Sequence, residues 1–121
     1  MKASKKKEMI DAWWKTLPFS KDIIMFWTDE TRKHLWARAF YKPRIIVIYG
    51  QMFKNTFESI QHILLHEVTH FEQLRRHGYS RHDACFQSIL IELIYAHGGQ
   101  DVMSAKESGA VATMNFKEDM E

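Results

Sequence analysis

A long apolar stripe in the middle of the chain sets the framework for the fold. Its members recur every three or four residues, as on one face of an α-helix. They are Phe57, Ile60, Ile63, Leu64, Val68, Phe71 and Leu74. Asn55 or Thr56 can cap the start of this helix, and Gly78 suits its C-terminal end. The pattern therefore predicts one helix that continues as far as His77.

Weaker helical patterns lie on either side of this segment. Apolar residues at helical spacing predict an N-terminal helix over residues 4–17, which Pro18 ends. A third helix is predicted to begin at Ser80, with Asp83 at the spacing of a capping box, and to end at Gly98. The last two predicted helices therefore follow each other directly.

Three short segments between the first two helices have the composition of β-strands. Residues 23–28 and 44–49 are rich in β-branched and aromatic side chains. Residues 35–41 suit a strand or a helix, and we favour a strand because the segment is short and lies between two others. Because the strands precede the helical pair instead of alternating with helices, the order predicts an α+β fold. In it, a sheet of two or three strands packs against the helices.

The length of the chain is that of one domain. It has 121 residues, of which 45% are hydrophobic and 26% charged, an ordinary balance for a protein that buries a core. We assign residues 1–103 to this domain. The segment 104–121 is made mainly of small and polar residues, and we expect it to be a loosely held tail.

Cysteine content and hydropathy exclude several classes of protein. Cys85 is the single cysteine, so the chain forms no intrachain disulfide and no cysteine-rich zinc finger. The longest apolar run, residues 45–49, is too short to cross a membrane, and the basic N-terminus lacks the apolar stretch of a signal peptide. We therefore expect a soluble, cytoplasmic protein. The net charge of +2 permits contact with nucleic acid without requiring it, and no feature indicates the oligomeric state.

The residues with the clearest chemistry are His66-Glu67-Val68-Thr69-His70, inside the predicted long helix. They match the pattern H-E-x-x-H. Residues four apart share one face of a helix, so both imidazoles can reach one Zn²⁺ ion. Glu67 is then the general base, which takes a proton from a metal-activated water and passes it to the leaving amine. The competing interpretation is a helix with surface histidines, which the apolar flanks of the motif disfavour.

A catalytic zinc site usually has a third protein ligand, and the sequence offers several candidates. His82 is favoured because it follows a glycine-containing turn and lies where the next helix can fold back over the first. Glu92 and His97 are the alternatives. His77 lies about 10 Å further along the helix axis than His70, which is too far to reach the same ion. His62 is not followed by a glutamate, and we expect it at the surface or behind the ligands.

The motif and its surroundings resemble a known family. HEVTH, followed by HDACF at residues 82–86, resembles the signature of the SprT-like zinc metallopeptidases. That signature is HExxH, a loop, and a third histidine in an H-G-x-x-F motif that opens the next helix. The run PRIIVIYGQ at residues 43–51 is similar to the strand that precedes the active helix in that family. The resemblance covers residues 20–95.

This resemblance implies a small zincin-like domain that hydrolyses peptide bonds in a protein or peptide substrate. It implies His66, His70 and His82 as Zn²⁺ ligands and Glu67 as the catalytic residue. Asp83 stands where the family has glycine. Those SprT-like proteins that cleave proteins crosslinked to DNA often carry a zinc ribbon, which a single cysteine does not allow here. DNA association is therefore only a hypothesis.

Two alternatives to a simple peptidase stay open. One is a non-catalytic zinc-binding module on the same fold. The other is a DNA-associated protease, whose phosphate contacts would come from residues 5–7 or from Arg75, Arg76 and Arg81. The glutamate directly after the first histidine of the motif argues for an enzyme, because a purely structural zinc site needs no base.

Overall fold

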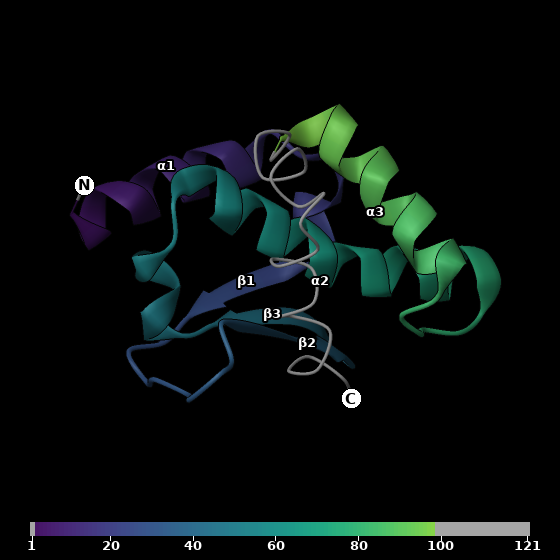
Figure 1. Cartoon of the computed structure of the whole chain (residues 1–121), viewed down its shortest axis with the longest axis horizontal. Coiled ribbons are helices and arrows are strands. Elements are labelled where there is room, and N and C mark those ends of the chain that lie inside the picture. Colours follow the sequence, from purple (N-terminus) through teal and green to yellow (C-terminus); the bar gives the residue numbers. More distant parts are fainter. Residues whose placement is uncertain (1, 99–121) are drawn as a thin grey trace.

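The order of elements in the structure, a computed structural model that describes residues 2–98, is the predicted one (Figure 1). The helices are α1 (Ala3–Lys15), α2 (Phe57–His77) and α3 (Ala84–His97), and the strands are β1 (Ile24–Trp27), β2 (Ala37–Tyr41) and β3 (Arg44–Ile48). Two 3₁₀ helices that the sequence pattern does not predict are η1 (Pro18–Lys21) and η2 (Gly50–Lys54). The α+β prediction is confirmed. The expected tail at 104–121 lies outside the described residues.

The three strands form one sheet in the order β1-β3-β2. The central strand β3 is parallel to β1 and antiparallel to β2. Ile46 of β3 is aligned with Met25 of β1 and with Ala39 of β2. Ile46 and Ala39 are buried towards the helices, as is Ala37 two residues earlier, because side chains alternate between the faces of a strand. The small alanines let α2 lie close against β2.

The middle turns of α2 are buried on nearly every side. In Figure 1, α2 lies between the sheet and the helices α1 and α3, all of which contact it. Ile60, Ile63, Leu64 and Val68 of α2 are fully buried, and α1 adds Ile10 and Trp14 to the same core. Polar side chains on these turns are therefore enclosed in the domain as well.

Both ends of α2 are defined by its sequence. Thr56 is the N-cap, and its hydroxyl accepts a hydrogen bond from the backbone N–H of Ser59 at 3.1 Å. At the other end Gly78 has φ 80°, a left-handed conformation that a residue without Cβ adopts easily. The chain can therefore turn back sharply after His77.

The third helix begins at Ala84, so the prediction of a start at Ser80 is wrong. Asp83 is itself the N-cap, and its Oδ1 accepts a hydrogen bond from the backbone N–H of Phe86 at 2.9 Å. The Ser80 hydroxyl contacts His70 and makes no cap. Residues 78–83 therefore connect α2 and α3 as a loop, which we call the 78–83 loop.

Candidate metal centre

Helix α2 places His66, Glu67 and His70 inside the domain. Their exposed fractions are 0%, 1% and 4%. The two imidazole rings lie 5.3 Å apart between centroids, as expected for residues four apart on one helix face. Imidazole and carboxylate groups are buried in proteins when they are hydrogen-bonded or bind a metal ion. These three buried side chains therefore need polar partners or a metal ion.

His82, from the 78–83 loop, meets these two histidines. One ring nitrogen of each of His66, His70 and His82 can be chosen so that all three lie within 4.8 Å of one another. The Nε2 atoms of His70 and His82 are 3.1 Å apart. Two nitrogens bound to one tetrahedral zinc ion at 2.0–2.1 Å are about 3.3 Å apart, so this pair of nitrogens has the spacing of two ligands of one metal ion. Two neutral imidazoles in a hydrogen bond have a similar separation, and the third ring is what favours a metal.

Two hydroxyl groups stand behind His70. Its Nδ1 lies 2.8 Å from Ser80 Oγ, which also accepts a hydrogen bond from the hydroxyl of Tyr41 at 3.2 Å. If His70 presents its Nε2 lone pair to a metal, Nδ1 carries the proton of the ring and donates a hydrogen bond to Ser80. The sequence pattern does not indicate this role, because it predicts Ser80 at the start of a helix. No periodic pattern relates Tyr41 to either residue.

Phe86 of α3 forms an apolar wall of the cluster. Its ring centroid is 4.9 Å from those of His66 and His70 and 4.8 Å from that of His82. The Phe86 side chain is fully buried. The ring therefore contacts all three imidazoles and shields one side of the cluster from water.

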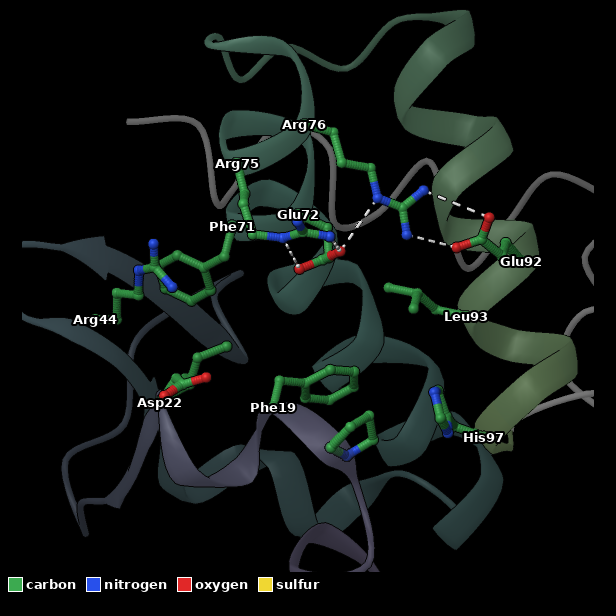
Figure 2. A pocket seen from close by; sticks show the side chains of 12 residues that line it. Phe19, Asp22, Arg44, Phe71, Glu72, Arg75, Arg76, Glu92, Leu93 and His97 are labelled. Carbon is green, nitrogen blue, oxygen red and sulfur yellow. Dashed lines mark hydrogen bonds and ion pairs between the residues drawn. The ribbon is translucent and has the colours of Figure 1, made fainter.

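Glu92 and His97, the alternative third ligands, lie in a different place. Both line a cavity of about 370 Å³ that none of the three clustered histidines lines (Figure 2). The Glu92 carboxylate is paired with Arg76 at 2.6 Å, and this partner lowers the pKa of Glu92. The backbone oxygen of His97 accepts a hydrogen bond from Trp13 Nε1 at 2.7 Å. Within residues 2–98 neither belongs to a group compact enough to hold a metal.

The predictions for the other two histidines of α2 agree with the structure in one case and not in the other. His62 is fully buried, so a surface position is wrong for it. The reason is tertiary, because the sheet and the other helices enclose this part of α2. His77 lies at the exposed end of the helix, near the ring of Tyr79, and takes no part in the cluster, as the axial distance predicts.

Several of the basic side chains considered for nucleic-acid contact have partners in the chain itself. Glu72 binds Arg75 at 2.8 Å and Arg76 at 3.2 Å, and Arg75 is the main cause that lowers the pKa of Glu72. Arg76 also binds Glu92 (Figure 2). Lys6 Nζ donates to two backbone oxygens of the η2 region. These contacts give no support to DNA association. None of the helices within residues 2–98 has the length and hydropathy of a membrane span.

Comparison with known proteins gives a likeness in fold. No family model matches the chain, and no curated protein matches it. Among solved structures, the chain is similar to the crystal structure of the metallopeptidase zymogen of Pyrococcus abyssi abylysin, with a TM-score of 0.56. The likeness covers 96% of this chain and 99% of that chain at 14% sequence identity. The protein therefore shares the fold of that structure, in agreement with the α+β fold expected from the sequence.

Proposed function

We propose that this protein is a zinc-dependent metallopeptidase that hydrolyses peptide bonds in a protein or peptide substrate. His66, His70 and His82 hold Zn²⁺, and Glu67 is the general base. The main support is the convergence of the three imidazoles, with nitrogens within 4.8 Å of one another, next in sequence to a glutamate that is 1% exposed. The fold shared with a metallopeptidase zymogen agrees with this function.

Zinc suits this set of donors. Imidazole nitrogen is a common zinc ligand, and three protein ligands leave a fourth position for water or substrate, as in catalytic zinc sites. A structural zinc site takes four protein ligands, whereas three are brought together within residues 2–98. When bound, the ion supplies a Lewis acid that polarises a carbonyl group and lowers the pKa of water towards about 7.

The proton transfers belong to Glu67. Its carboxylate takes a proton from the attacking water and delivers it to the nitrogen of the leaving amine. Because the side chain is 1% exposed, little bulk water competes for that proton. Ser80 Oγ accepts a hydrogen bond from Nδ1–H of His70 and so keeps the Nε2 lone pair of this ring facing the other ligands. Phe86 keeps water from one side of the cluster.

Membership of the SprT-like family is a separate and more specific proposal. It is supported by HEVTH and by HDACF at residues 82–86. Asp83, which replaces the glycine of that motif, is the N-cap of α3. The departure is therefore compatible with a helix that opens directly after the third histidine.

A non-catalytic zinc-binding module is the competing function, and two measurements separate it from a peptidase. We would measure zinc content by elemental analysis, and hydrolysis of labelled casein and a mixed peptide pool, for the wild type, Glu67→Gln and His82→Ala. His97→Ala is the matched control, because it removes a histidine outside the cluster.

The expected result is one zinc per chain in the wild type, Glu67→Gln and His97→Ala, and a reduced content in His82→Ala. Hydrolysis should fall by about 10²–10⁴-fold or more in Glu67→Gln and persist in His97→Ala. No stoichiometric zinc in the wild type, supplied with zinc at neutral pH, would refute the proposal. Zinc bound without hydrolysis of any substrate in the pool would favour the non-catalytic module.

A further inference from the structure

The 78–83 loop, which contains His82, is held against α2 by the side chain of Gln73. Gln73 is fully buried. It lies three residues after His70 and therefore on the same face of α2 as His66 and His70. A buried amide costs free energy unless its oxygen and nitrogen both form hydrogen bonds, so the partners of this side chain are informative.

Both ends of the Gln73 amide are used, one on each side of His82. Oε1 accepts a hydrogen bond from the backbone N–H of Arg81 at 2.7 Å. Nε2 donates to Oδ1 of Asp83 at 3.0 Å. Arg81 and Asp83 are the immediate sequence neighbours of His82. One planar amide therefore fixes the chain directly before and directly after this histidine.

Asp83 links this contact to the rest of the loop and to α3. Its Oδ1 also accepts from the backbone N–H of Phe86 at 2.9 Å, and its Oδ2 accepts from the Tyr79 hydroxyl at 2.9 Å. The loop is thus tied at residues 79, 81 and 83, while His82 is left to face His70.

We infer that Gln73 is a positioning residue for the metal centre, whose amide holds His82 where its Nε2 meets that of His70. The inference rests on the proposed metal site. A ligand on an untied loop loses conformational freedom when the metal binds, and this loss weakens binding. Removing a residue that orients a ligand typically costs 10–100-fold in metal affinity. Ser80 belongs to the same loop and contacts His70 Nδ1, so the loop makes a second contact with the centre.

Gln73→Met tests the inference because it keeps the length of the side chain and removes both hydrogen bonds. Gln61→Met is the matched control. Gln61 is a second buried glutamine of α2, 7% exposed, and it lies beside Gly98 at the far end of α3. We would measure Zn²⁺ affinity by competition with a chromophoric chelator, the visible absorption of the Co²⁺-loaded protein, and urea unfolding of the metal-free protein.

The expected result is a Zn²⁺ affinity 10–100-fold lower for Gln73→Met and unchanged for Gln61→Met. The Co²⁺ absorption should change in the same direction as in His82→Ala, measured alongside, because it reports the geometry of the ligands. A general loss of stability would not move it. Equal Zn²⁺ affinity in Gln73→Met and the wild type, or an equal loss in Gln61→Met, would overturn the inference. No Zn²⁺ binding by the wild type would instead refute the proposed metal site itself.

Asp83→Ser tests the same attachment from the loop side if Gln73→Met does not fold. Serine keeps a cap for the N–H of Phe86 but is too short to reach the Gln73 amide and the Tyr79 hydroxyl. The N–H of Arg81 remains bound to Gln73, so a loss of affinity smaller than that of His82→Ala is expected. Wild-type affinity and an unchanged Co²⁺ spectrum in this variant would also overturn the inference.

Discussion

Phe86→Ala should destabilise the protein and disturb the proposed metal centre together. The ring is fully buried and lies within 4.9 Å of each of the three imidazole centroids. Replacing a buried phenylalanine by alanine typically costs 3–5 kcal/mol. We expect the upper part of this range, because the hydrogen bond between His70 and Ser80 opposes movement of this ring into the cavity. The stability of a domain this size is about 5–15 kcal/mol, so the variant would be marginal.

Zinc provides the second part of this prediction. A ligand at a hundredfold excess over its dissociation constant stabilises the folded state by about 2.7 kcal/mol. The wild type should gain that amount at such an excess of Zn²⁺. At the same zinc concentration Phe86→Ala should gain less, because its three imidazoles are no longer packed against a common ring.

Urea unfolding of metal-free and zinc-loaded protein, followed by circular dichroism, measures both effects. Ile91→Ala is the control on the same helix. Ile91 is 39% exposed, and its truncation should cost only about 1 kcal/mol. A loss below about 1 kcal/mol for Phe86→Ala would refute the argument that this ring fills the space between α3 and the histidines. If Zn²⁺ stabilised Phe86→Ala as much as the wild type, the argument that this ring supports the metal centre would be refuted.

Two smaller perturbations test the description of α2. Arg75 and Arg76 lower the pKa of Glu72 below its ordinary value of 4.5, so the ion pairs contribute stability above that pH and lose it as the pH falls through the lowered pKa. Glu72→Gln should therefore lower the free energy of unfolding by up to about 1 kcal/mol at pH 7 and by nothing in strong acid. A difference in urea midpoints that does not change with pH would contradict an origin in the ion pairs. Thr56→Ala should lower the free energy of unfolding by about 0.5–2 kcal/mol, because the N-cap hydrogen bond from Ser59 is lost. Thr56→Ser keeps the hydroxyl and should cost little. Equal losses of stability for the two variants in thermal unfolding would contradict the role of Thr56 as a cap.

Local patterns in the sequence were sufficient to predict the three α-helices and the three strands, but not the two 3₁₀ helices. The helical stripe, a cap at Asn55 or Thr56 and the glycine at position 78 predict α2 almost to the residue. Their interactions are short-ranged, since a cap or a C-terminal glycine acts within one turn. The pairing of His66 with His70 is of the same kind, because 3.6 residues per turn place residues four apart on one face.

Longer-range features were predicted less well. The start of α3 was placed at Ser80, because serine and Asp83 at this spacing resemble a capping box. Tertiary contacts decided otherwise: Ser80 bonds to His70, and Asp83 bonds to Gln73 as well as to its own helix. His62 was expected at the surface or behind the ligands, and only the packing around α2 shows that it is buried.

By itself, the sequence determined the order of helices and strands and the helix that presents His66, Glu67 and His70, because both depend on spacing along the chain. It left three candidates for the remaining ligand. Only the tertiary structure brought His82 to the other two histidines and placed Glu92 in an ion pair elsewhere. The physical reason is that the position of His82 depends on how a loop docks on a helix. That docking is decided by hydrogen bonds such as those of Gln73, which no periodic pattern encodes.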